Sequence, residues 1–229
     1  MSVWFCIPSA RTVEQSAPVF AAWHKMGYKI AIVTDDEAPR DVDLQVVCDS
    51  YPGYANSVNY LAKRVLAENL DCDWIVCGGD DTYPDPNVMA DEIADQCNQH
   101  FGRLSGGSTF GVMQPTGHRW GNGSRAYIDR ICGSPWLGRE WCLRAHQGNG
   151  PMHHGFFHMH VDEALQELAV RLGVLWQRPD LTHFHEHWML KGQPMPKFLE
   201  RANSREHWNE SSGLLQRLRD SEFRECMPI

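Results

Sequence analysis

The chain has 229 residues, of which 42% are hydrophobic and 22% charged, and its formal net charge is −8. This length suits one globular domain, no apolar run reaches the ~20 residues of a membrane-spanning helix, and the negative charge argues against broad electrostatic binding to nucleic acid. The start of the chain, MSVWFCIPS, has no basic leader, and the eight cysteines form no C-x-x-C pair, so we expect a cytoplasmic protein with reduced thiols, no signal peptide and no cysteine zinc site.

Strand-like and helix-like segments alternate through the first half of the chain. Short apolar runs at 3–7, 28–33, 44–48, 74–77 and 108–114 predict strands, and segments at 12–27, 54–69 and 86–101 predict helices between them. Thr12 stands where a helix N-cap belongs, and Gly27 stands where that helix should end. The alternation predicts crossover connections and a mostly parallel central sheet flanked by helices, which is an α/β fold.

The second half is less regular and is rich in Gly, His and aromatic residues. A helix is predicted over 161–173, with Gly173 at its end, and the tail from 196 onwards is also expected to be helical. The tail arginines indicate either a solvated helix face or a local patch that contacts phosphate; they are Arg201, Arg205, Arg217, Arg219 and Arg224.

Two adjacent carboxylates follow the buried run at 74–77. In parallel sheets ligands bind beyond the carboxyl ends of the strands, and the loop here reads Gly78-Gly79-Asp80-Asp81. Two acids that repel each other become favourable if they hold a hard divalent cation, which prefers oxygen ligands and often shares them with substrate phosphates. The alternative interpretation is a strand-end turn with solvated acids.

The sequence of a strand, then GGDDTYPDPN, then a helix resembles the D-x-D loop of GT-A fold glycosyltransferases of the family-2 type. The resemblance implies a Rossmann-like GT-A fold in which this loop holds the metal that binds the donor diphosphate. Asp80 and Asp81 would then be ligands of Mn²⁺ or Mg²⁺, while Gly78 stands where the family has its first Asp. It also implies one domain over 1–229, with a nucleotide-binding half at 1–115, an acceptor and catalytic half at 116–195 and a helical tail at 196–229.

Other segments extend the resemblance along the chain. CIPSARTVEQ looks like the family's first strand and loop, AIVTDD like its second strand, and YPGYANSVNYLAKR like its Gly…Asn helix start. The residues that these matches place near the nucleotide, together with the loop glycine, are Pro8, Arg11, Asp35, Tyr54, Asn56, Lys63 and Gly79.

The segment GNGPMHHGFFHMHVDEALQELAVRLG resembles the family's Gly-Gly-Phe…Glu-Asp…Leu…Leu…Gly segment. That match implies Asp162 as the general base of an inverting enzyme, although Val161 replaces the preceding Glu. It also implies contacts to the acceptor or donor sugar from Trp136, Asn149 and Gly150, with Trp136 as an aromatic platform.

The late segment LTHFHEHW resembles the family's His-x-His strand, in which one histidine completes the metal site: His185 or His187 here. Histidines at alternating positions share a face of an extended chain. Simple packing of hydrogen-bonded histidines beside aromatic residues is one alternative. A zinc-dependent hydrolase that uses His183, His185, His187 and Asp162 is another.

These matches together predict a hexosyltransferase-like enzyme that moves a sugar from a nucleoside diphosphate, with UDP as the first candidate, to an acceptor hydroxyl without inserting into a membrane. The acceptor is left open between a saccharide and a hydroxymethylated DNA base, because phage-encoded enzymes of this appearance modify such bases. A non-catalytic nucleotide-sugar binding protein is the remaining alternative.

Overall fold

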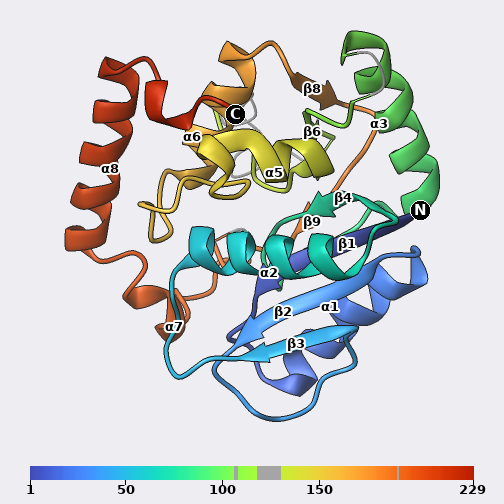
Figure 1. Cartoon of the computed structure of the whole chain (residues 1–229). Coiled ribbons are helices and arrows are strands. Elements are labelled where there is room, and N and C mark those ends of the chain that lie inside the picture. Colours follow the sequence, from blue (N-terminus) through green and yellow to red (C-terminus); the bar gives the residue numbers. More distant parts are fainter. Residues whose placement is uncertain (106–107, 118–129, 190) are drawn as a thin grey trace.

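The computed structural model describes residues 1–105, 108–117, 130–189 and 191–229. Helices cover both faces of a central sheet, which confirms the expected α/β class (Figure 1). The elements of the first half are β1 (Ser2–Pro8), α1 (Val13–Lys25), β2 (Lys29–Thr34), β3 (Leu44–Val47), α2 (Tyr54–Glu68), β4 (Cys72–Val76), β5 (Thr82–Tyr83), α3 (Ala90–Ser105) and β6 (Val112–Pro115). Those that follow are β7 (Trp136–Gly138), α5 (Arg139–Gly148), α6 (Val161–Arg171), β8 (Leu175–Arg178), β9 (Phe184–His185), α7 (Lys197–Glu200), α8 (Arg205–Asp220) and the 3₁₀ helix η1 (Arg224–Cys226).

The main sheet has the strand order β3-β2-β1-β4-β7-β6-β8. Strands β1 to β4 run parallel to one another, and β6 runs parallel to β8. Strand β7 is antiparallel to both of its neighbours, β4 and β6. The sequence did not predict β7, because three residues are too few to show the alternation of a strand. A separate two-stranded pairing joins β5 to β9.

Alternation along β1 divides the core between the two faces of the sheet. Phe5 faces α1, where its ring stacks on Trp23 with 3.8 Å between the ring centroids. Cys6 faces the other way, into the cluster that α2, α5 and α6 form with residues such as Leu61. Because side chains of a strand alternate between faces, the apolar run at 3–7 fits a strand that is buried on both sides.

Three helix ends follow the expected chemistry and one departs from it. Thr12 forms a capping box with Gln15 at the start of α1, and Gly27 and Gly173 adopt positive φ just after α1 and α6. Helix α3 begins at Ala90 and not at 86, since Asp85 holds Asn87 in a turn that precedes the helix.

The C-terminal segment packs on α6 and lies on the opposite side of the molecule from α3 (Figure 1). Leu215 and Leu218 of α8 are buried in the same cluster as Leu165 and Leu168 of α6. All eight cysteines are free, and Cys48 is the one that is not fully buried. None of the described helices is long and apolar enough to span a bilayer.

Candidate functional site

Asp80 holds together the loops that follow β1 and β4. Its Oδ2 accepts hydrogen bonds from Ser9 Oγ (2.9 Å) and from the backbone amides of Ala10 (3.2 Å) and Arg11 (3.3 Å). Its Oδ1 accepts a hydrogen bond from Arg11 Nε at 3.0 Å. Burial raises the pKa of Asp80, and the charge of Arg11 opposes that shift. Both carboxylate oxygens of Asp80 are therefore used to fasten one loop to the other.

Asp81 faces the β9 segment. Its Oδ2 accepts a hydrogen bond from Arg11 Nη2 at 3.0 Å, and its Oδ1 lies 3.0 Å from His185 Nε2. Burial alone would raise the pKa of Asp81, but the hydrogen bond and charge of His185, together with Arg11, outweigh burial and lower it. Asp81 is therefore ionised at neutral pH and is the carboxylate of the pair that meets an imidazole.

The backbone around Asp81 fixes this geometry. A Cβ atom on Gly79 would lie 2.5 Å from Asp81 Oδ1, so a side chain at that position would displace the carboxylate. Thr82 pairs with His185 across the β5–β9 strands, and Asp85 accepts a hydrogen bond from the Thr182 amide at 2.9 Å. These contacts bring a segment from late in the chain against the loop after β4.

Arg40 extends the cluster to the end of β2, and it was not among the residues selected from the sequence. Its side chain is 1% exposed, and it donates to Ser9 Oγ, Ser16 Oγ and Asp36, with 3.2 Å between Nη2 and Asp36 Oδ2. Because the Ser9 hydroxyl donates a hydrogen bond to Asp80, Arg40 helps to hold Ser9 in place for that contact. An arginine surrounded by acids in the EAPRDVD loop was the only signal available.

The three late histidines do not converge. His183 is buried, with Nδ1 2.7 Å from Ser134 Oγ, and burial lowers its pKa to about 3. His185 meets Asp81, and the His187 ring lies 5.1 Å from the His185 ring between centroids. Burial, followed by the charge of His185, lowers the pKa of His187 to about 4, which leaves that ring neutral at pH 7.

The chemistry of a divalent cation fits this site at Asp81 and His185, with His187 beside them. One carboxylate and one or two imidazoles suit Mn²⁺, and oxygen atoms of a bound diphosphate are the usual remaining ligands. Asp80 does not fit the same role, because its two oxygens already accept four hydrogen bonds. Among the residues that the structure describes, no three His, Cys, Asp or Glu side chains form a ready metal site, so phosphate oxygens are needed to complete one.

The start of α2 lies against the segment that precedes α6. Gly53 has φ +95°, and a Cβ there would lie 2.7 Å from the carbonyl oxygen of Phe157, which accepts a hydrogen bond from the Tyr54 amide. Burial raises the pKa of Tyr54, and the charge of Asp162 raises it further. Asn56 donates to the Pro52 carbonyl and helps close the first turn. The first turn of α2 therefore packs on the segment that precedes α6 and Asp162.

Asp162 is the second residue of α6, after His160 at the N-cap position, so it is not the N-cap itself. Its Oδ1 accepts a hydrogen bond from the Glu163 amide at 2.9 Å, and burial raises its pKa. Glu163 is committed elsewhere: it pairs with Arg130 (3.1 Å), Arg219 (2.9 Å) and His160 (3.0 Å). Of the two adjacent acids, only Asp162 has the raised pKa that suits a proton acceptor.

In the part of the chain that the structure describes, the remaining expected site residues form no hydrogen bond or ion pair with the acids described above, although one of these residues is a neighbour of the Asp80 clamp in the chain. Pro8 ends β1 next to the Asp80 clamp, and Asp35 is exposed just after β2. Lys63 is exposed on α2, about 13 Å along the helix from Tyr54 by the usual rise per residue. Asn149 donates to the His146 carbonyl at the end of α5, and Gly150 packs against Asn59 of α2.

The expectation for Trp136 is wrong. Its side chain is 0% exposed and lies in β7 among the core residues next to α1 and α3, with its ring edge-on to Tyr28. An aromatic platform needs an exposed face, which this ring does not have. The apolar pair Trp136-Leu137 serves as a central strand of the sheet.

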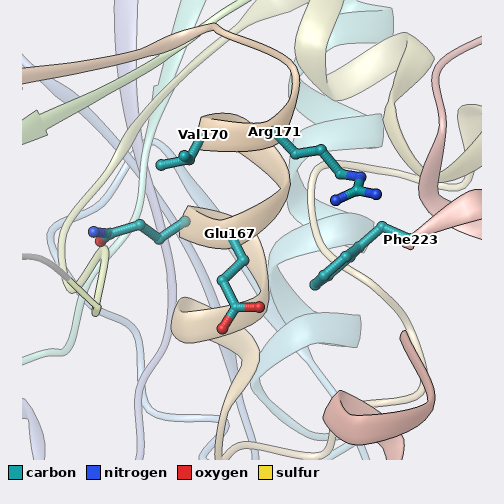
Figure 2. Close-up of a pocket in the computed structure, with 5 residues that line it drawn as sticks. Glu167, Val170, Arg171 and Phe223 are labelled. Carbon is teal, nitrogen blue, oxygen red and sulfur yellow. The ribbon is translucent and has the colours of Figure 1, made fainter. Parts of the chain in front are cut away.

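A hollow of about 340 Å³ lies between α6 and the turn after α8, away from the residues described above. Figure 2 shows Glu167, Val170 and Arg171 on α6 and Phe223 on the turn that closes it. None of its lining residues belongs to the cluster around Asp80 and Asp81, so it is not assigned to the candidate active site.

No protein-family model and no curated protein sequence matches the chain, but solved structures do. The catalytic domain of Drosophila β1,4-galactosyltransferase 7 in complex with xylobiose is 14% identical over 89% of this chain and 80% of that one, with a TM-score of 0.50. A mutant of that enzyme in complex with manganese, UDP-Gal and xylobiose is 15% identical over 90% of this chain and 81% of that one, with a TM-score of 0.47. A197 from STIV is 11% identical over 82% of this chain and 86% of that one, also with a TM-score of 0.47. The first likeness confirms the expected GT-A glycosyltransferase fold.

Proposed function

We propose that the chain is a glycosyltransferase that takes its sugar from a nucleoside diphosphate, with UDP as the first candidate, and transfers it to an acceptor hydroxyl with the help of a divalent cation. The observation that supports this most is the Asp81–His185 pair, with 3.0 Å between carboxylate and imidazole, beyond the carboxyl ends of the strands in a GT-A fold. Arg11, which donates to both Asp80 and Asp81, lies on the loop that the resemblance places beside the nucleotide.

The balance of charge explains why a cation is part of the proposal. The strand ends hold the carboxylates of Asp36, Asp80 and Asp81, against the guanidinium groups of Arg11 and Arg40. Adding a diphosphate to this surface would bring more negative charge to a place that has no surplus of positive charge. A divalent cation held by Asp81 and His185 would supply Lewis-acid neutralisation of the departing diphosphate.

Asp162 is proposed to accept the proton of the acceptor hydroxyl. Burial raises the pKa of this carboxyl, which brings it nearer to the pH at which a base must work. Tyr54 is close enough for the charge of Asp162 to influence its pKa, and the charge of Asp80 likewise raises the pKa of Tyr51, after burial.

Nucleotide-dependent thermal stabilisation tests the proposal. UDP or a UDP-sugar at a hundred times its dissociation constant should add about 2.7 kcal/mol and raise the melting temperature by about 5–10 °C when Mn²⁺ is present. The increase should disappear in EDTA and in the Asp81→Asn variant. Equal stabilisation with and without EDTA would contradict the role of the cation, and no stabilisation by any nucleotide sugar would contradict the proposed function.

The hydrolase alternative has no comparable support. His183 shares a hydrogen bond with Ser134 in the interior, whereas His185 contacts Asp81. A zinc site made by His183, His185 and His187 would therefore require this segment to change its conformation.

A further inference from the structure

Five aromatic residues lie outside both hydrophobic clusters of the core, in the loop before α2, in the segment before α6 and in the first turn of α8. The Tyr51 ring meets the Phe157 ring edge-on at 5.3 Å between centroids, and Phe157 stacks on His207 at 4.4 Å. The next residue of α8, Trp208, meets His160 at 4.8 Å. We call these five residues the aromatic row.

The two ends of the aromatic row are tied to the two halves of the candidate site. At one end, Tyr51 lies in the loop before α2, and burial followed by the charge of Asp80 raises its pKa. At the other end, His160 donates to Glu163 and stands at the N-cap position of α6, two residues before Asp162. The row therefore extends from the loop before α2 to the start of α6, next to the proposed base.

Phe157 has a structural role, because Gly53 lies against it and Arg201 lies over its ring at 5.0 Å. Trp208 has no such role in the core: it is 48% exposed, while Tyr51, Phe157, His160 and His207 are each partly exposed. A large exposed apolar side chain beside other partly exposed rings is a candidate binding surface. The buried Nε2 of His160 has no hydrogen-bond partner among the residues that the structure describes, which leaves an unsatisfied polar atom beside the Trp208 ring.

The charge around the row favours a neutral ligand. The exposed charged residues beside it, on the α7–α8 turn and the first turns of α8, are two arginines and two glutamates: Arg201, Arg205, Glu206 and Glu210. They cancel, whereas a surface that binds nucleic acid presents a surplus of positive charge. A neutral saccharide has apolar ring faces that pack on aromatic side chains and hydroxyl groups that satisfy nearby polar atoms.

We propose that the aromatic row is the acceptor subsite, that its ligand is a neutral oligosaccharide, and that Trp208 packs directly on one sugar ring. This inference rests on the proposed function. It assigns the α7–α8 segment to substrate binding, a role that the sequence suggested only as a possible phosphate patch.

Fluorine NMR of protein labelled with 5-fluorotryptophan tests the proposal on the full chain, with UDP and Mn²⁺ present. The nine tryptophans give separate signals, and the Trp208→Phe variant identifies the signal of Trp208. The probes are xylobiose, cellobiose, lactose and maltose. We expect at least one of them to shift the Trp208 signal and leave the signals of buried tryptophans such as Trp136 unchanged.

Variants then separate packing on the sugar from a structural role. Trp208→Ala should weaken the affinity for that disaccharide about tenfold, and Trp208→Phe by no more than about threefold. Tyr60→Ala, which removes another exposed aromatic ring from α2, should leave that affinity unchanged. Thermal unfolding of each variant shows that the fold is retained.

Three results would overturn the proposal: no probe shifts the Trp208 signal, Trp208→Ala binds the disaccharide as tightly as the unmodified protein, or only an oligonucleotide with hydroxymethylated bases shifts the signal. The failure of the proposed function looks different. In that case UDP with Mn²⁺ gives no thermal stabilisation, whatever the saccharides do at Trp208.

Discussion

Two pairs of adjacent acids occupy the candidate site, Asp80-Asp81 after β4 and Asp162-Glu163 at the start of α6. In each pair, one carboxylate fastens parts of the chain together. Asp80 accepts four hydrogen bonds from the loop after β1, and Glu163 pairs with cationic groups of Arg130 and Arg219. In each pair the other carboxylate faces the region where chemistry would occur. Two acids that are neighbours in the sequence therefore have different roles: one stabilises the structure of the site, and the other is available for chemistry.

The pKa values of the two fastening carboxylates move in opposite directions. Burial raises the pKa of Asp80, whereas the hydrogen bonds from His160 and Arg130 outweigh burial and lower the pKa of Glu163. The difference lies in the supply of positive charge. Asp80 shares the single guanidinium of Arg11 with Asp81, but Glu163 has two arginines within 3.1 Å. Both can fasten the structure, but only Glu163 does so mainly through ion pairs.

The largest expected effect comes from replacing Asp162 at the start of α6. Asp162→Asn should reduce sugar transfer by about 10²–10⁴, because Asn cannot take the proton of the acceptor hydroxyl. The melting temperature should stay the same or rise. The pKa of Asp162 is raised in the folded state, so this carboxyl lowers the free energy of unfolding as pH increases through that pKa, and Asn removes the effect. Steady-state kinetics and calorimetry measure the two quantities. Transfer at the unmodified rate would place the base elsewhere.

A smaller effect should separate the two acids after β4. Asp81→Asn should lower the affinity for Mn²⁺ in the presence of UDP by at least about tenfold, and it should also lower the stability of the unliganded protein near pH 7, because Arg11 and His185 lower the pKa of Asp81 in the folded state. Asp80→Asn should leave the affinity for Mn²⁺ nearly unchanged and lose about 1–3 kcal/mol of stability, because an amide cannot accept all four of the hydrogen bonds that Asp80 accepts. Isothermal titration and chemical denaturation would show this. Equal losses of metal affinity in both variants would mean that Asp80 is also a ligand.

The smallest effect concerns the arginines of α8. Arg219→Gln should cost about 0.5–1 kcal/mol near pH 7, because Arg219 pairs with Glu163 and Glu167 from an exposed position, while Arg217→Gln should cost less, since no ion pair to Arg217 is present among the described residues. The pKa of Glu163 is lowered in the folded state, so the stability from this pairing is complete above its ordinary pKa and is lost as pH falls through the folded value. The gap between the two variants should therefore shrink in acid. A gap that stays constant with pH would contradict the ion-pair explanation.

The first half of the chain was predictable because each of its features is local. The apolar run at 3–7, the Thr12 cap and the glycine after α1 belong to one strand or one helix, and each is present in the structure. The loop after β4 and its two adjacent acids could also be recognised in the sequence, since the carboxyl ends of the strands meet at one edge of a parallel sheet.

The rest depended on contacts between distant segments, which no local pattern records. The sequence suggested a platform at Trp136, but the structure uses that ring in a core strand and exposes Trp208 on α8. Arg40 and Ser9 became visible only when β1 and β2 were placed side by side. The tail arginines looked equivalent in sequence, and Arg217 and Arg219 are both exposed, yet Arg219 pairs with Glu163 and Glu167 from a segment about 50 residues earlier, as its contacts show.

The position of β7 has a consequence for how the chain reaches its native state. Trp74 of β4 pairs with Gly138 of β7, and β7 in turn lies between β4 and β6. During synthesis, β4 therefore emerges from the ribosome long before its neighbour, with one backbone edge unpaired. Such edges invite association between chains, and distant pairings slow folding. A fragment that stops at residue 115 would keep this edge open, so we expect it to aggregate, even though it contains the whole carboxylate pair.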